Sequence, residues 1–162
     1  MMEELVFFSI GGNLGDRMAL LEETCDFIDF NIGDIVMKSK VFETAAWGMD
    51  VDTPPFLNQI LGVKTAMTLA QIEKEIQEID EYYGRQRFGE GYHNREMDVD
   101  VLYYKNEVHE SPLIVPHGKI AERAFILHPL AEIAPDLKHP TTGLTSMEML
   151  KKCTDSSAVK VL

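Results

Sequence analysis

Two aspartates, Asp98 and Asp100, interrupt an otherwise apolar stretch of the chain. The other residues from Met97 to Tyr104 are apolar or aromatic, which predicts a buried strand. Side chains alternate across a strand, so both carboxylates point to one face, about 7 Å apart. Such a pair could be a solvated sheet face. With no Cys or neighbouring His, the pair favours a hard cation, usually Mg²⁺, that completes its coordination with water and phosphate.

Cations gather around these aspartates in the sequence. Arg85, Arg87 and Arg95 precede them in and after a stretch with three glycines, and His117 and Arg123 follow. Arginine binds phosphate oxygens through two parallel hydrogen bonds. Each arginine taken singly could be a surface residue paired with a glutamate, but the chain has 27 acidic residues and the cluster reverses that sign locally. The combination favours phosphate binding beside a metal ion.

An aromatic residue and an amide share one face of another predicted strand. Phe56 and Asn58 lie two positions apart, while Phe125 and Trp47 lie on distant segments. Aromatic side chains usually belong to the core. However, an amide beside an aromatic wall supplies donors and acceptors for a flat heterocycle, so a ring-binding slot is the alternative interpretation.

A glycine-rich segment, "GGNLGDR", runs from Gly11 to Arg17. It resembles a phosphate-binding loop, but it lacks the Gly-Lys-Ser/Thr ending of the P-loop and the spacing of the dinucleotide fingerprint. The glycines could equally serve only to turn the chain between a strand and a helix.

The elements that must position these residues follow from periodicity and capping signals. Their order, strand, helix, strand, strand, helix, strand, predicts an α+β fold with a ferredoxin-like core, an antiparallel sheet covered by helices. A further helix, broken near Pro129, a short helix and a final strand at the C-terminus follow. The expected ranges are Leu5–Ile10, Asp16–Phe30, Ile35–Thr44, Phe56–Thr65, Leu69–Tyr83 after the cap Thr68, Met97–Tyr104, Ile120–Ala134 and Ser146–Lys152.

Composition limits the classes of function. The 162 residues predict a single domain over residues 1–162. A net charge of −12 argues against nucleic-acid and membrane partners, both of which favour cationic proteins. No signal peptide or membrane span is evident, and two cysteines predict free thiols. We therefore expect a cytoplasmic protein, and a monomer, that binds small molecules.

Five segments, in order, carry a resemblance to a known family: "GGNLGDR", "VFETAAWG", "FLNQ", "GRQRFGEGYHNREMDVDVLYY" and "VPHGKIAERAFILHPLAEIAPDL". They resemble 6-hydroxymethyl-7,8-dihydropterin pyrophosphokinase, a family of folate biosynthesis. The resemblance implies transfer of pyrophosphate from Mg·ATP to the pterin hydroxymethyl group with release of AMP. It also implies Mg²⁺ as cofactor, as two ions, and ATP and a reduced pterin as substrates.

The resemblance assigns roles residue by residue. Asp98 and Asp100 match the Mg²⁺ ligands, and with Arg85 and Arg95 they form the expected catalytic set. The expected pterin contacts are Thr44, Ala46, Trp47, Gly48, Phe56, Asn58 and Phe125. The expected ATP contacts are Gln77, Arg85, Arg87, Arg95, Val101, His117 and Arg123. Independently of the resemblance, the glycine-rich stretch from Gly84 to Asn94, which has no apolar periodicity, is expected to act as a lid over the phosphates.

Two rival interpretations remain open from the sequence. A ferredoxin-like regulatory module could bind a small anion or nucleotide without chemistry. Alternatively, the carboxylate pair could form a purely structural Ca²⁺ site. Neither rival needs a paired aromatic slot or a second substrate.

Overall fold

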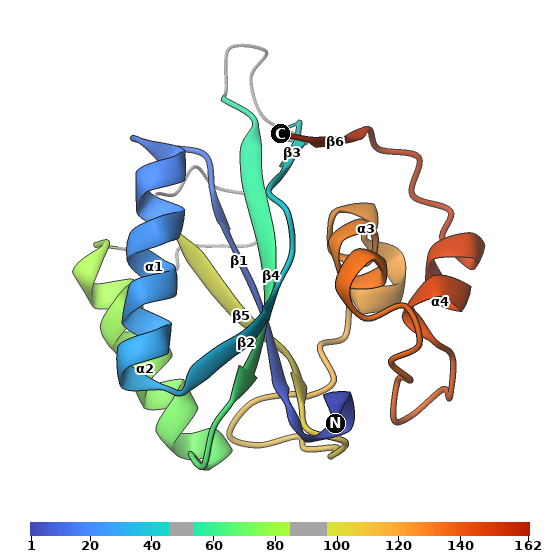
Figure 1. The fold of residues 1–162 in the computed structure, drawn as a ribbon, viewed down its shortest axis with the longest axis horizontal. Coiled ribbons are helices and arrows are strands. Elements are labelled where there is room, and N and C mark those ends of the chain that lie inside the picture. Colours follow the sequence, from blue (N-terminus) through green and yellow to red (C-terminus); the bar gives the residue numbers. More distant parts are fainter. Residues whose placement is uncertain (46–53, 85–96) are drawn as a thin grey trace.

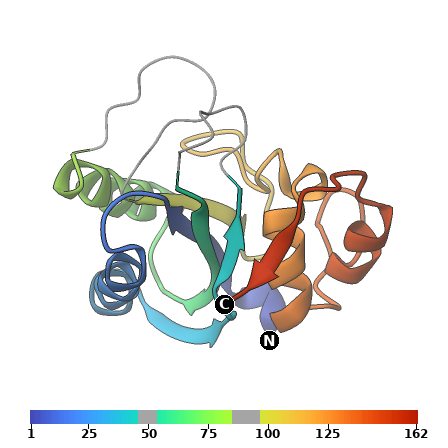
Figure 2. The same cartoon turned by 90° about the horizontal axis from the view of Figure 1, so that it is seen from above.

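The structure, a computed structural model, describes residues 1–45, 54–84 and 97–162. In this part of the chain, a six-stranded sheet lies between two layers of helices (Figures 1 and 2). The strands run in the order β5-β1-β4-β3-β6, and β2 also pairs with β4. The strands are β1 (Val6–Gly12), β2 (Asp34–Lys38), β3 (Phe42–Thr44), β4 (Phe56–Lys64), β5 (Asp98–Tyr104) and β6 (Val159–Val161).

The predicted fold class is confirmed. Each neighbouring pair of strands is antiparallel. The helix α1 (Arg17–Asn31) follows β1, and α2 (Leu69–Tyr82) connects β4 to β5. Together β1, α1, β2 with β3, β4, α2 and β5 give the ferredoxin-like order, with β1 lying between β5 and β4.

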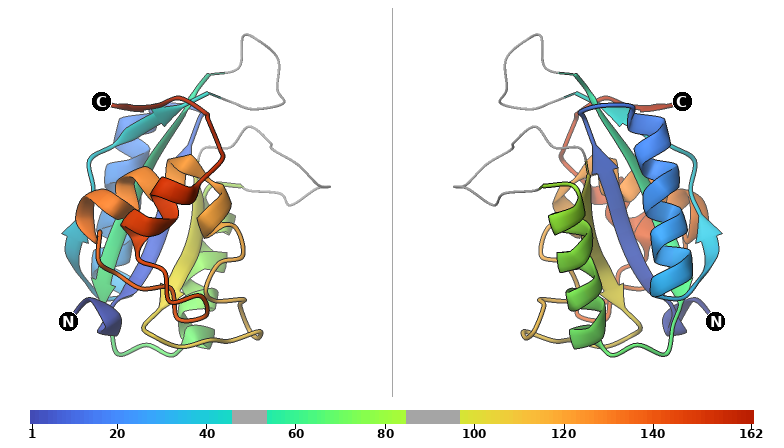
Figure 3. Two further views of the ribbon diagram at one scale, coloured as in Figure 1. Left: turned by 90° about the vertical axis from the view of Figure 1, so that its right-hand side faces the viewer. Right: turned by 90° about the vertical axis from the view of Figure 1, so that its left-hand side faces the viewer.

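The helices α1 and α2 lie side by side on one face of the sheet (Figure 3). Val6, Phe8 and Ile10 of β1 are fully buried in the apolar core beneath them. Both predicted caps are confirmed: Asp16 accepts a hydrogen bond from the amide of Ala19, and Thr68 forms a reciprocal capping box with Gln71. Burial of the apolar stripe of α2 and these caps explain why the two helices begin where the sequence predicts.

The other face is covered by α3 (Ala124–Ile133) and α4 (Ser146–Lys152), with a short 3₁₀ helix η2 (Ile120–Glu122) before them (Figure 1). Phe7, on the opposite face of β1 from Phe8, packs in this second core with Leu102 of β5. Asp98 and Asp100 alternate with the buried Val99 and Val101 of the first core. Both aspartates therefore face the α3 layer, on one face of β5 as predicted.

Two predicted elements need correction. The single strand expected from Ile35 to Thr44 is two strands, because Ser39 interrupts it and uses its hydroxyl to accept the amide hydrogen bond of Ile60. The helix expected from Ile120 to Ala134 does not break at Pro129, which lies inside α3. The break comes at Arg123, whose extended backbone separates η2 from α3.

Cys25 and Cys153 are both free thiols, as predicted. Among the residues described, no helix combines the length and the apolar character that a bilayer crossing requires.

Candidate active site

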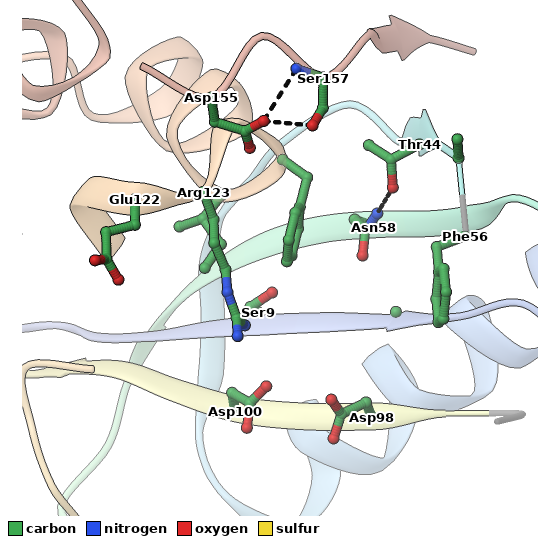
Figure 4. Close-up of a pocket in the computed structure, with 14 residues that line it drawn as sticks. Ser9, Thr44, Phe56, Asn58, Asp98, Asp100, Glu122, Arg123, Asp155 and Ser157 are labelled. Atoms are coloured by element: carbon green, nitrogen blue, oxygen red, sulfur yellow. Dashed lines mark hydrogen bonds between the residues drawn. The ribbon is translucent and has the colours of Figure 1, made fainter. Parts of the chain in front are cut away.

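A cavity of about 310 Å³ lies between the sheet and α3 (Figure 4). Seven residues predicted from the sequence line it: Thr44, Phe56, Asn58, Asp98, Asp100, Arg123 and Phe125. They come from three strands, the η2–α3 junction and α3 itself, which are distant in the sequence. The fold therefore brings the expected metal ligands, ring slot and one phosphate-binding cation into a single pocket.

The floor of the cavity is set by strand register. Gly11 of β1 pairs with Asp98 on one side and with Asn58 on the other. Paired residues point to the same face, so the carboxylate and the amide stand at the two ends of one row, about 10 Å apart between their α-carbons. Gly11 has no side chain, which leaves room above it for the side-chain oxygen of Asn58.

A direct hydrogen bond orients the amide. The Asn58 side chain donates from Nδ2 to the hydroxyl oxygen of Thr44 at 3.0 Å, and both residues are buried. Thr44 pairs with Phe56 across β3 and β4, so the phenyl ring begins the next row of the same floor. The Thr44 hydroxyl accepts from Asn58 and keeps its own proton to donate to a ligand.

The opposite wall comes from the start of α3. Phe125 lies in the first turn of this helix and is half-buried. The guanidinium carbon of Arg123 lies 5.6 Å from the centroid of the Phe125 ring, a cation–π distance. A ring wall and a cation therefore enter the cavity together, opposite the floor that carries Phe56 and Asn58.

The glycine-rich segment does not form a phosphate loop at Gly11 and Gly12, because both lie inside β1. Its polar side chains instead donate hydrogen bonds to the residues directly before β4. Asn13 donates to the carbonyl of Pro54 at 3.1 Å, and Arg17 donates to the carbonyl of Pro55 at 2.8 Å. These bonds fix the chain directly before Phe56.

Three of the expected nucleotide contacts lie outside the cavity wall. Gln77 is exposed on α2, and the Val101 side chain is buried in the first core, so only the Val101 backbone can meet a ligand. Burial, helped by the charge of Arg123 and opposed by Asp98, lowers the pKa of His117 below its ordinary value of 6.5. His117 Nδ1 accepts from the amide of Lys119 at 3.1 Å, so a neutral ring carries its proton on Nε2.

The remaining predicted site residues lie outside the described part of the chain: Ala46, Trp47, Gly48, Arg85, Arg87 and Arg95. The expected lid, apart from its first residue, Gly84, lies outside it as well. The roles expected for these residues stay predictions.

The set of predicted site residues did not include seven residues that line the cavity: Ser9, Gly11, Ala45, Glu122, Ile126, Asp155 and Ser157. Ser9 pairs with Asp100 across β1 and β5, and a lone serine inside an apolar strand is a signal that points to that face. Asp155 and Ser157 offered no such signal, because they lie between a short helix and a short strand, outside any periodic element.

The donors expected from the sequence for a metal ion are Asp98 and Asp100. Within the described ranges there is no group of three or more His, Cys, Asp or Glu side chains that could hold a metal by themselves. Mg²⁺ is usually held by one or two protein carboxylates together with water and substrate phosphates. Two aspartates on one face, at the edge of a cavity, fit that pattern.

Comparison with known proteins agrees with this geometry. The family model described as 7,8-dihydro-6-hydroxymethylpterin-pyrophosphokinase (HPPK) matches residues 7–135. A 2-amino-4-hydroxy-6-hydroxymethyldihydropteridine pyrophosphokinase of Porphyromonas gingivalis is 32% identical over 140 residues, covering 84% of this chain and 94% of that protein. The protein of the same name from Aquifex aeolicus is 34% identical over 137 residues, covering 83% of each chain.

A structural relative extends the comparison to the fold. The Plasmodium falciparum HPPK-DHPS triple mutant with pteroate superposes with a TM-score of 0.72 at 15% identity, over 91% of this chain and 43% of that one. This chain thus spans less than half of that longer protein, and at such identity the likeness concerns the fold. The sequence matches decide the family: the chain belongs to the 7,8-dihydro-6-hydroxymethylpterin-pyrophosphokinase family.

Proposed function

We propose that the chain transfers the pyrophosphoryl group of Mg·ATP to the hydroxymethyl group of 6-hydroxymethyl-7,8-dihydropterin and releases AMP. Membership of the family supports pyrophosphoryl transfer to this acceptor and a place in folate biosynthesis. The observation that carries the site assignment is the row Asp98, Gly11 and Asn58. This row puts a carboxylate and a ring-reading amide at opposite ends of one cavity floor.

The pterin ring would lie at the Asn58 end of the floor. Asn58 keeps its side-chain oxygen as an acceptor, and the Thr44 hydroxyl keeps a proton to donate. A pterin edge presents both N–H donors and nitrogen or oxygen acceptors, so this pair reads it in two directions. Phe56 from the sheet and Phe125 from α3 offer the apolar surfaces for the ring faces.

The phosphates would lie at the Asp98 end. Asp98 and Asp100 would hold Mg²⁺, which, when bound, neutralises phosphate charge and makes the phosphorus a better electrophile. Arg123 supplies a positive charge at the same cavity, and neutral His117 can donate from Nε2 to a phosphate oxygen. We assign Arg85, Arg87, Arg95, Gln77 and the Val101 backbone to the nucleotide on the strength of the family resemblance.

The reaction needs positioning more than covalent help from the protein. The pterin hydroxyl oxygen attacks the β-phosphorus of ATP and loses its proton to solvent. The bond between the β-phosphorus and the bridging oxygen breaks, and AMP leaves with that oxygen and the electron pair. Asn58, Thr44 and the two phenylalanines fix the attacking group, and the cations stabilise the charge that develops on the leaving phosphate.

The test is to incubate the chain with ATP and Mg²⁺ and to measure AMP with and without the reduced pterin alcohol. We expect AMP only when the pterin is present, together with an equal amount of pterin pyrophosphate. Formation of ADP, or the same AMP release in both samples, would contradict the proposal. A binding module without chemistry would yield neither product.

A further inference from the structure

The C-terminal segment from Cys153 to Val161 forms part of the cavity wall, although it lies beyond residues 7–135 that the family model matches. Burial alternates along it. Cys153, Asp155, Ser157 and Val159 are half-buried, and the residues between them are exposed. The segment leaves α4, passes the start of α3 and ends as β6 at the edge of the sheet (Figures 1 and 4). Asp155 and Ser157 line the cavity.

Asp155 supplies the cap that α3 lacks. The N-cap position of α3 is Arg123, whose side chain makes no capping hydrogen bond. Instead, Asp155 Oδ2 accepts from the amide of Ala124 at 2.9 Å, across 31 residues of sequence. By contrast, α1, α2 and α4 are each capped by the residue directly before the helix. The capped turn carries Phe125 and follows Arg123, and both of these residues line the cavity.

The Asp155 carboxylate is itself held in place. Ser157 donates to Asp155 Oδ1 from its backbone amide at 3.0 Å and also from its hydroxyl (Figure 4). These bonds, the Ser157 hydroxyl first and the Ala124 amide second, lower the pKa of Asp155 below its ordinary value. The group is therefore ionised at neutral pH, the state that best complements a helix N-terminus.

The same segment also pairs with β3, on the floor side of the cavity. Val159 of β6 pairs with Thr44 of β3, and Val161 pairs with Phe42. Thr44 in turn accepts from the Asn58 amide. One short segment thus ties the first turn of α3 to β3, the strand that carries Thr44.

We propose that Asp155 is a positioning residue for the pterin substrate. Asp155 holds the first turn of α3, and with it Phe125, at a fixed distance from Thr44 and Asn58 on the floor of the cavity. This inference rests on the proposed function, because it takes the ring between these walls to be the pterin. Asp155 acts through Ala124 and Phe125 and takes no part in the chemistry. Its loss loosens the ring slot, whereas Asp98 and Asp100, which lie on β5 at the phosphate end of the cavity, keep their geometry.

The experiment compares Asp155→Ala and Asp155→Asn with the parent chain. Asparagine also caps helices well, whereas alanine does not. We expect Asp155→Ala to raise the KM for the pterin about fivefold, the equivalent of about 1 kcal/mol for a lost cap, with a much smaller change in the KM for ATP. Asp155→Asn should restore most of the parental KM for the pterin.

Thr145→Ala is the matched control. Thr145 caps α4 by accepting from the amide of Glu148, and it lies outside the cavity wall. Its loss costs a helix cap of the same kind, so the melting temperature should fall in both alanine variants. Only Asp155→Ala should also change the KM for the pterin, which separates positioning from general destabilisation.

The outcomes separate the two proposals. If the parent releases AMP with pterin, but Asp155→Ala keeps the parental KM for pterin or raises both KM values equally, the positioning role is wrong. If the parent releases no AMP, the proposed function fails instead. If Asp155→Ala does not fold, Ser157→Ala replaces it, because this change removes only the hydroxyl donor to Asp155. Ser157→Ala should raise the KM for the pterin by a smaller factor. An unchanged KM for the pterin would overturn the positioning role.

Discussion

Gly11 and Asn58 face each other across β1 and β4 so closely that a Cβ atom on Gly11 would lie 2.5 Å from Asn58 Oδ1. It would also lie 2.6 Å from the carbonyl oxygen of Leu57. A glycine is therefore required at this position for steric reasons, and φ plays no part in the requirement. The floor between Asp98 and Asn58 depends on this missing side chain.

Replacing Gly11 tests the floor. Gly11→Ala should displace the Asn58 amide and weaken binding of a pterin analogue more than about tenfold, because the amide can no longer pair with the ring edge. The contact with the Leu57 backbone should lower the free energy of unfolding by about 1–3 kcal/mol. Titration calorimetry and denaturant unfolding measure the two effects.

Gly118→Ala is the control, since a Cβ at Gly118 would meet nothing within 4 Å. It should leave both the stability and the affinity for the pterin analogue near the parental values. Parental affinity in Gly11→Ala as well would show that Asn58 does not read the ring.

The ring slot gives a second prediction. Phe125→Ala should weaken pterin binding by about 1 kcal/mol or more, because one apolar face of the site is lost. Phe30→Ala is the matched change, at a phenylalanine of α1 that is 88% exposed and far from the cavity. Titration of a pterin analogue in the presence of an inert ATP analogue compares the two, and equal affinities would place the ring elsewhere.

The sequence predicted the parts of this site that depend on local pattern. Alternation along β5 was enough to place Asp98 and Asp100 on one face. The capping signal and a 3.6-residue apolar period were enough to predict the position and buried face of α2. The roles of the residues came from resemblance to the family, not from periodicity. The assignment of those roles stays a prediction.

What the sequence did not reveal depends on tertiary contacts. The need for glycine at Gly11 arises only when β1 pairs with β4, 47 positions away in the case of Asn58. Asp155 lies at the site because its carboxylate caps α3 through the amide of Ala124, 31 residues earlier in the chain. Pro129 was expected to break a helix, yet it is buried within α3. There the packing of Ile126, Leu127 and Leu130 in the second core outweighs the hydrogen bond that Pro129 cannot donate.

A third prediction concerns pH and His139. Burial lowers the pKa of His139 below its ordinary value of 6.5. Its Nδ1 accepts from the amides of Thr141 and Thr142, and its ring meets the edge of Tyr103. Between the folded-state pKa of His139 and the ordinary value of 6.5, the unfolded chain therefore binds more protons than the folded protein. The contribution of neutral His139 to the free energy of unfolding is present above pH 6.5 and is lost as the pH falls from 6.5 through the folded-state pKa.

Denaturant unfolding measured from neutral pH to about pH 5 checks this sign. The free energy of unfolding of the parent should fall over this range. In His139→Gln the fall should be smaller, and because His117 titrates in both proteins, the difference isolates His139. A parallel decline in the two proteins would remove His139 as the cause.

The carboxylate pair gives the fourth prediction. Asp98→Ala and Asp100→Ala should each lose most turnover, by about 100-fold or more, because the phosphate charge is no longer neutralised at the site. Both side chains are only half-buried, so the melting temperature should stay near that of the parent. Asp34→Ala, at an exposed strand aspartate of β2, is the matched control and should keep the parental rate.

The most direct test of Mg²⁺-dependent pyrophosphoryl transfer at this site is the initial rate of AMP formation as a function of Mg²⁺ concentration. The rate is measured with ATP and the reduced pterin present, in the parent and in the Asp98→Ala, Asp100→Ala and Asp34→Ala proteins. We expect a saturable Mg²⁺ dependence that the parent and Asp34→Ala share and that both cavity variants lose. A parental rate in Asp98→Ala or Asp100→Ala at saturating Mg²⁺ would contradict it.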